Sequence, residues 1–128
     1  MFSILCFAVD AQTSNYSGTG NWTSTGNWSN GIPTSNTNAT TTIGASIIVN
    51  STGVCNNLTL FLSSLTINAG TQLTINGIFT ATTTGNNTNN GTLIMRGNVK
   101  PAIGTTVLTV NGGVTTVSGL TFPSFTID

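Results

Sequence analysis

The sequence predicts an all-β protein whose short strands coil into a parallel β-helix, also called a β-solenoid. Apolar and polar residues alternate in a phrase that occurs twice, with Leu65 and Ile67 in the first copy and Leu73 and Ile75 in the second. This alternation has the period of a half-buried strand. Weaker echoes of the phrase follow at residues 107–112 and 125–128. Strand phrases that repeat along a chain are typical of coiled, repeating β structures.

Two further observations favour the β-helix over a β-sandwich, the alternative that also contains short strands joined by turns. Leu73, Leu93 and Leu108 are separated by twenty and fifteen residues, which is a suitable length for one coil. Asparagine also recurs where strand phrases end, and we expect these side-chain amides to stack and to hydrogen-bond along the coil axis. The asparagines concerned are Asn50, Asn68, Asn76 and Asn111.

Residues 1–11 differ in composition from the rest of the chain. Met1–Val9 is apolar, and Val9 and Ala11 are small residues at the positions that a signal peptidase requires. We therefore expect a truncated secretory signal peptide, a mature chain that begins at Gln12, and an extracellular or cell-surface location. The alternative is a first strand that packs into the core. The apolar run is too short to span a bilayer.

Residues 12–42 are predicted to form a polar cap segment that contains tryptophan. Gly-Asn-Trp-Thr around Trp22 and Gly-Asn-Trp-Ser around Trp28 form a six-residue near-repeat among turn residues. Aromatic rings can stack on a pyranose, so Tyr16, Trp22 and Trp28 are candidates for a glycan platform. Bulky side chains can equally cover the open end of the first coil, and we favour this cap over a sugar site.

Residues 43–128 are predicted to supply the coils. The first firm strand is expected at 43–50, and further strands are expected at 58–60, 65–67, 73–75, 78–79, 92–95, 105–110, 114–117, 120–122 and 125–127. Turns are expected at 68–70 and at Asn76-Gly77, where the dipeptide is a strong signal for positive φ. Residues 82–91, rich in Thr, Asn and Gly, are expected to form a protruding loop. The chain shows no helical periodicity.

Composition restricts the function. The chain has two basic residues, two acidic residues and no histidine, so it lacks the basic footprint of a nucleic-acid-binding protein. Neither a carboxylate pair, nor a metal cluster, nor a catalytic triad can be assembled from these residues. We expect no enzyme activity, no metal and no cofactor. Low charge provides little repulsion between copies, which favours an assembly or a surface location.

Cysteine usage depends on the leader. If residues 1–11 are removed, Cys55 is the single cysteine of the mature chain, and if they are retained, Cys6 and Cys55 are able to pair. Cys55 precedes a predicted strand, so it is interpreted as a small buried apolar side chain. Without a histidine, it has no general base to activate it as a nucleophile.

The order of these motifs resembles the N-terminal part of Bacteroidota-type secreted β-solenoid surface proteins, which include adhesin-like members. The matching features are Trp28-Ser29, Gly31-Ile32-Pro33, the phrase Val54-Cys55-Asn56-Asn57-Leu58-Thr59-Leu60, and the two Leu-Thr-Ile ladders. The match covers most of the mature chain. Members of this group are longer and end in a secretion-sorting domain, so the resemblance implies either a fragment or a short subunit whose next coil comes from another molecule.

The C-terminal segment suggests how such a subunit would associate. Phe122, Phe125 and Ile127 lie in an apolar, strand-like stretch, and an uncovered strand edge is a template for pairing with another chain. We therefore expect a structural or adhesive protein that self-assembles head to tail or by strand exchange into a surface fibre. Two alternatives are a carbohydrate-binding module that uses the tryptophans and an ice-binding array of threonines.

Overall fold

The computed structural model describes the backbone of residues 10–82, 87–97, 99–101, 106–110, 114–117 and 125–127, and the side chains of residues 10–81 and 87–97. This part of the chain contains fifteen strands and one short 3-10 helix, η1 (Thr25–Asn27). The strands pair in parallel throughout. The all-β prediction is confirmed, and the parallel pairing differs from the antiparallel sheets of a β-sandwich.

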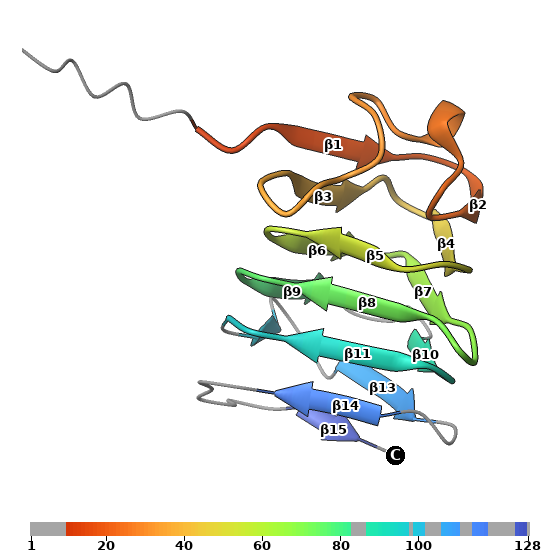
Figure 1. The fold of residues 1–128 in the computed structure, drawn as a ribbon, viewed down its shortest axis with the longest axis vertical. Helices are drawn as coiled ribbons and strands as arrows, with labels where there is room; N and C mark the ends of the chain where they lie inside the picture. Colours follow the sequence, from red (N-terminus) through yellow and green to blue (C-terminus); the bar gives the residue numbers. More distant parts are fainter. Residues whose placement is uncertain are drawn as a thin grey trace, which may run out of the picture.

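The described strands form three sheets (Figure 1). In spatial order, sheet A contains β1 (Thr13–Tyr16), β3 (Asn38–Thr41), β6 (Leu58–Phe61), β9 (Phe79–Thr82) and β12 (Val99–Pro101). Sheet B contains β2 (Thr19–Asn21), β4 (Ser46–Val49), β7 (Ser64–Ile67), β10 (Asn87–Asn89), β13 (Thr106–Val110) and β15 (Phe125–Ile127). Sheet C contains β5 (Gly53–Cys55), β8 (Gln72–Ile75), β11 (Thr92–Met95) and β14 (Val114–Val117).

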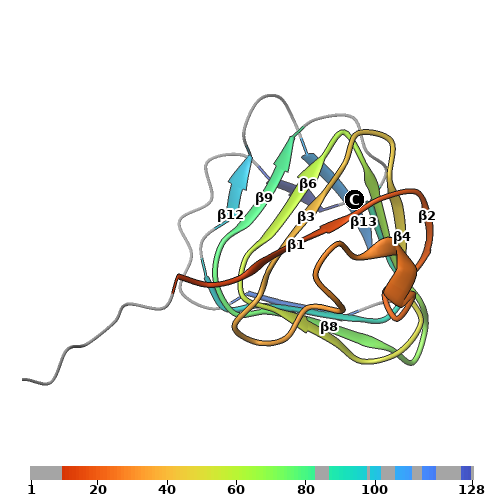
Figure 2. The same cartoon turned by 90° about the horizontal axis from the view of Figure 1, so that it is seen from above.

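From β3 to β14 the chain visits sheets A, B and C in turn, and we call one such passage a circuit. Each strand pairs with the strand one circuit later, so that Ile47 pairs with Leu65 and Leu65 pairs with Asn87. These two steps are 18 and 22 residues long. Seen from above, the three sheets surround a common interior (Figure 2).

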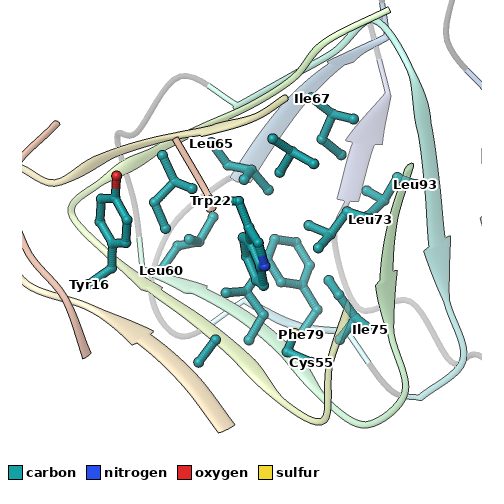
Figure 3. Packing of buried hydrophobic residues seen from close by; sticks show 14 of the residues in the cluster. Tyr16, Trp22, Cys55, Leu60, Leu65, Ile67, Leu73, Ile75, Phe79 and Leu93 are labelled. Atoms are coloured by element: carbon teal, nitrogen blue, oxygen red, sulfur yellow. The ribbon is translucent and has the colours of Figure 1, made fainter. Parts of the chain in front are cut away.

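Alternation within each strand places the apolar side chains in this interior (Figure 3). In β7, for example, Leu65 and Ile67 are buried, whereas Ser64 and Thr66 are partly exposed. The same pattern occurs in β3, β4 and β11. β-Branched and leucine side chains therefore stack on one another from circuit to circuit. The fully buried core side chains include Trp22, Tyr16, Phe79, Ile47, Leu58, Leu60, Leu65, Ile67, Leu73, Ile75, Leu93 and Met95.

The two predicted turns are built differently. Gly70 has φ +76°, and Thr71 closes this turn by donating its backbone N–H to Asn68 O at 3.1 Å. Gly77 is not among the glycines with positive φ, so the predicted reason for its presence is wrong. A Cβ at Gly77 would overlap the side-chain oxygen of Asn57. Close approach, and not backbone handedness, requires glycine there.

Several boundaries differ from the predictions. The strand expected at 43–50 is confined to β4, and the strand expected at 120–122 lies outside the described residues. Residues 12–42, for which no strand was predicted, contain three strands, β1 to β3, that pair within sheets A and B. These strands carry few large apolar residues, which is why periodicity did not reveal them.

The stretch 82–91, expected as a protruding loop, contains β10. Asn87 and Asn89 face the interior and are 3% and 0% exposed. Hydrogen bonds compensate part of the cost of burying these amides: Leu65 N donates to Asn87 Oδ1 at 3.1 Å, and Gly91 N donates to Asn89 Oδ1 at 3.0 Å. Composition alone indicated a loop, because the bond from Leu65 and the strand pairing of β10 come from neighbouring circuits.

Candidate functional site

The first candidate site is the aromatic cluster at the end of the molecule that contains β1 and β2. Tyr16 and Trp28 meet edge to face with ring centroids 4.8 Å apart, and Trp22 and Trp28 do so at 5.1 Å. Trp28 Nε1 donates to Trp22 O at 2.7 Å, and the hydroxyl of Tyr16 donates to Asn21 O at 3.2 Å. Edge-to-face packing and these bonds hold the three rings in a fixed arrangement.

These rings are buried. Tyr16 is 0% exposed, Trp22 1% and Trp28 4%. Burial raises the pKa of the Tyr16 hydroxyl above its ordinary value, and a hydrogen bond with Asn27 opposes this shift. A sugar ring needs an accessible aromatic face, so the structure argues against a glycan-stacking role for Tyr16, Trp22 and Trp28. Their position over the first strands agrees instead with the cap.

Trp22 is the centre of this cap. Its side chain points into the interior, where Figure 3 shows it among the labelled core residues. A Cβ added to Gly53 would lie 3.2 Å from Trp22 Nε1, so the indole packs directly against the first strand of sheet C. Trp22 Nε1 is a buried donor without a hydrogen-bond partner. The side chain therefore acts as an apolar plug rather than as a polar contact.

The leucines and isoleucines of the two predicted ladders face the interior, but on two different sheets. Leu65 and Ile67 lie on sheet B, where they stack on Ile47 and Val49. Leu73 and Ile75 lie on sheet C, where they stack on Leu93 and Met95 of the next circuit. The two copies of the phrase are thus successive sides of one circuit. The spacing of Leu73 to Leu93 is confirmed as one circuit, whereas Leu108 belongs to sheet B and pairs with Asn87.

The expected asparagine stack is divided between two corners. Asn50 and Asn68 follow β4 and β7 of sheet B, and Asn68 N donates to Val49 O at 3.0 Å. Asn76 follows β8 of sheet C, and its Oδ1 accepts a hydrogen bond from Arg96 Nη1 at 3.0 Å. Asn111 lies outside the described residues. Asn76 therefore lies at a different corner from Asn50 and Asn68, because the phrases that carry them belong to different sheets.

Hydrogen-bonded amides do occur, at the corner between sheets C and A. Asn38 Oδ1 accepts from Asn56 Nδ2 at 3.0 Å and from Asn57 Nδ2 at 2.9 Å. Asn57 Oδ1 accepts from the backbone N–H of Ile78 at 2.7 Å. This cluster links three successive circuits. The adjacent pair Asn56-Asn57 just before a strand was the available sequence signal.

The outer face of sheet B presents an array that the sequence analysis missed. Ile48 pairs with Thr66 and Thr66 with Thr88, so that the partly exposed side chains of these three residues follow one another along the sheet. The backbone register continues from Thr88 to Thr109. No pattern within a single strand indicates this column, because β7 and β10 each contribute one central threonine. The recurring Leu-Thr-Ile and Leu-Thr-Val phrases were the signal.

A polar pocket of about 420 Å³ lies beside the start of β1. Its lining includes Asp10, Gln12, Thr34, Thr37 and Asn56. Thr34 Oγ1 and Thr37 Oγ1 are 3.0 Å apart and share a hydrogen bond. Asp10 and the neighbouring Ala11 belong to the predicted leader, so cleavage before Gln12 would remove one wall of this pocket.

The remaining reactive side chains are dispersed. Cys55 is a buried free thiol whose pKa burial raises to about 12, and Cys6 lies outside the described residues. Lys100 pairs through its backbone with Thr80. Within the described residues, no three side chains of the metal-binding types gather at one place.

The end strands of the sheets are β12, β14 and β15, at the end remote from the aromatic cap (Figure 1). Phe125 and Ile127, predicted for an assembly edge, lie in β15 and pair with Thr106 and Leu108 of β13. Phe122 lies outside the described residues.

Comparison with protein-family models, curated proteins and solved structures finds no match for this chain. Among the described residues, no helix has the length and apolar character needed to cross a membrane.

Proposed function

We propose that the chain is a non-enzymatic, extracellular structural or adhesive β-solenoid that assembles through the end of the molecule that contains β14 and β15. The observation that carries this proposal is the contrast between its two ends. Tyr16, Trp22 and Trp28 cover the interior beside β1 and β2. At the other end, β12, β14 and β15 are the outermost described strands of the three sheets.

An outermost strand presents backbone N–H and C=O groups along its free edge and can pair with a strand from another chain. Parallel pairing with one strand per sheet and circuit is the arrangement that a parallel β-helix requires, and further circuits extend it without a change of geometry. Another copy of the chain would meet little electrostatic repulsion, because the formal net charge is zero. Head-to-tail stacking and exchange of a terminal strand both use this end.

Electron microscopy and light scattering of the purified full chain test the assembly. We expect filaments or oligomers whose size grows with protein concentration. The variant Phe125→Asp places a charge in β15, and we expect it to reduce assembly. Asn50→Asp is the matched control, because it adds the same charge at an exposed position on the side of the molecule. A monomer at every concentration, or assembly unaffected by Phe125→Asp, would contradict the proposal.

Export is tested separately. When the full chain is expressed in a bacterial host with a secretory pathway, the protein should be exported, and mass spectrometry of the exported protein should show Gln12 as the first residue. Recovery only from the cell interior, with Met1 retained, would contradict the extracellular location.

A further inference from the structure

The outward side chains of sheet B form a regular, uncharged surface, which we call the B face. Its described side chains are partly or fully exposed and lie in three columns that run across β4, β7 and β10. The columns are Ser46 and Ser64, then Ile48, Thr66 and Thr88, then Asn50, Asn68 and Asn90. Seven of these eight side chains carry a hydroxyl or an amide, and none carries a charge.

Two kinds of contact restrain the B face: the packing of the buried residues beneath it and hydrogen bonding along its columns. The alternate residues of the same strands, among them Ile47, Val49, Leu65 and Ile67, are fully buried. Ser64 Oγ donates to Ser46 Oγ at 3.0 Å, so neighbouring hydroxyls also constrain each other. Threonine adds its own stiffness, because branching at Cβ restricts χ1. The hydroxyls therefore repeat at fixed positions.

The distance between neighbouring residues of a column is close to a distance between water oxygens in ice. Neighbouring strands are about 4.7–4.9 Å apart, so the hydroxyls of Thr66 and Thr88, in register, are expected at about this separation. In a tetrahedral network of water with hydrogen bonds of about 2.8 Å, second-neighbour oxygens lie about 4.5 Å apart. Successive threonine hydroxyls of a column can therefore take the places of second-neighbour waters in such a network, or hydrogen-bond to waters at those places. The methyl group of each threonine then lies between the hydroxyls.

The other two faces fit this role less well. On sheet A, the column Thr40, Thr59 and Thr80 is in register, but the hydroxyl of Thr40 donates a hydrogen bond to Asn15 Oδ1. Phe61 is 43% exposed on the same face, and a large exposed ring interrupts a regular layer of water. On sheet C, the central outward column contains the apolar residues Val54 and Ile94 on either side of the buried Thr74.

We propose that the B face binds ice through these rows of hydroxyl and amide groups. This activity does not rest on the assembly proposal, because it uses the side of the molecule and not its ends. A monomer can therefore bind ice, and a filament would only lengthen the columns.

The test measures thermal hysteresis and inhibition of ice recrystallisation with the purified full chain. We expect the natural chain to show both, and Thr66→Tyr to lose both, because a large ring at the centre of the B face keeps ice away. Thr59→Tyr is the matched control: Thr59 is the central outward threonine of β6 on sheet A and is also partly exposed. It should retain the activity of the natural chain. Circular dichroism and thermal unfolding establish that both variants are folded.

Two results would overturn the proposal. One is a natural chain that is folded but has no effect on ice growth, including the case in which it binds an insoluble polysaccharide such as cellulose instead. The other is an equal loss of activity in folded Thr59→Tyr and Thr66→Tyr, which would show that the B face is not the surface involved. Retained ice activity in a chain that stays monomeric would support this inference while contradicting assembly.

Discussion

Gly77 lies against the side chain of Asn57, at a point where a Cβ would overlap Asn57 Oδ1. The same oxygen accepts the backbone N–H of Ile78 at 2.7 Å, just before β9 begins. The glycine thus makes room for an amide that fixes the entry into the next strand. One circuit later, a Cβ at Gly97 would in turn overlap the backbone carbonyl of Gly77. The corner between sheets C and A therefore requires small residues one above the other.

Replacing this glycine should destabilise the protein. We expect Gly77→Ala to lower the free energy of unfolding by about 1–3 kcal/mol, the usual cost of forcing extra atoms into a packed site. Urea denaturation followed by circular dichroism measures the change. Gly26→Ala is the control, because nothing lies within 4 Å of its added Cβ, and its effect should stay within about 0.5 kcal/mol. Equal losses in the two variants would contradict the close approach.

The amide cluster should contribute more than an exposed corner asparagine. Asn57→Ala removes the acceptor for Ile78 N and the donor to Asn38 Oδ1, and we expect a loss of about 1–3 kcal/mol. Asn50→Ala removes a long contact of 3.4 Å with Thr23 at an exposed position, so its effect should be small. The comparison uses the urea midpoints of both variants, and a greater loss for Asn50→Ala would disprove the assignment.

The two tryptophans of the cap should respond differently to the loss of the indole N–H. Trp28→Phe removes the donor that satisfies Trp22 O at 2.7 Å, whereas Trp22→Phe removes a donor that has no partner. Both variants lose a similar volume, so their difference reports the hydrogen bond, and we expect Trp28→Phe to be less stable by about 1–3 kcal/mol. Thermal and urea unfolding measure both. If Trp22→Phe proves the less stable variant, the role of the indole bond is wrong.

Stability should fall in alkaline solution. Burial raises the pKa of the Cys55 thiol from 9.0 to about 12, so the unfolded chain loses this proton at a lower pH than the folded chain does. The resulting stabilisation is complete below about pH 9 and is lost as the pH rises towards about 12. Tyr16, whose pKa burial also raises, acts in the same direction.

Substituting Cys55 separates the contribution of its thiol to the alkaline loss of stability from that of Tyr16. Urea midpoints at a series of pH values should fall less steeply above pH 9 for Cys55→Ala than for the natural chain, although the variant is less stable at neutral pH because it leaves a cavity. The alkaline slope, and not the absolute stability, is the diagnostic quantity. An identical slope in both proteins would mean that the thiol is not protected from ionisation.

The sequence identified strands well where apolar residues alternate strictly. The phrases at Leu65 and Leu73 and the segments at 92–95 and 114–117 became β7, β8, β11 and β14. It did not reveal which phrases stack, because adjacent copies of one phrase lie on different sheets. Register depends on the length of each circuit, and the steps of 18 and 22 residues in sheet B are too irregular to read from the pattern alone.

The candidate sites were predicted less well for a related reason. Aromatic residues among turn residues suggest an exposed platform, yet Trp22 and Trp28 are drawn inward by the uncovered end of the core. The threonine column of the B face was missed because it runs across strands, at right angles to the chain. Both features depend on contacts between circuits, and a linear pattern contains no such contacts.

A chain made of similar circuits can pair a strand with the wrong neighbour during folding, because the neighbours resemble one another. A strand could enter its sheet one level too early and still find apolar neighbours. Asn87 works against this error, because its buried amide oxygen accepts the backbone N–H of Leu65 at the level where β10 pairs with β7. At another level this amide would be buried without that partner, at a cost of about 1–3 kcal/mol. The strand β10, which places asparagines instead of apolar residues in the interior, thus favours one pairing of the circuits over the others.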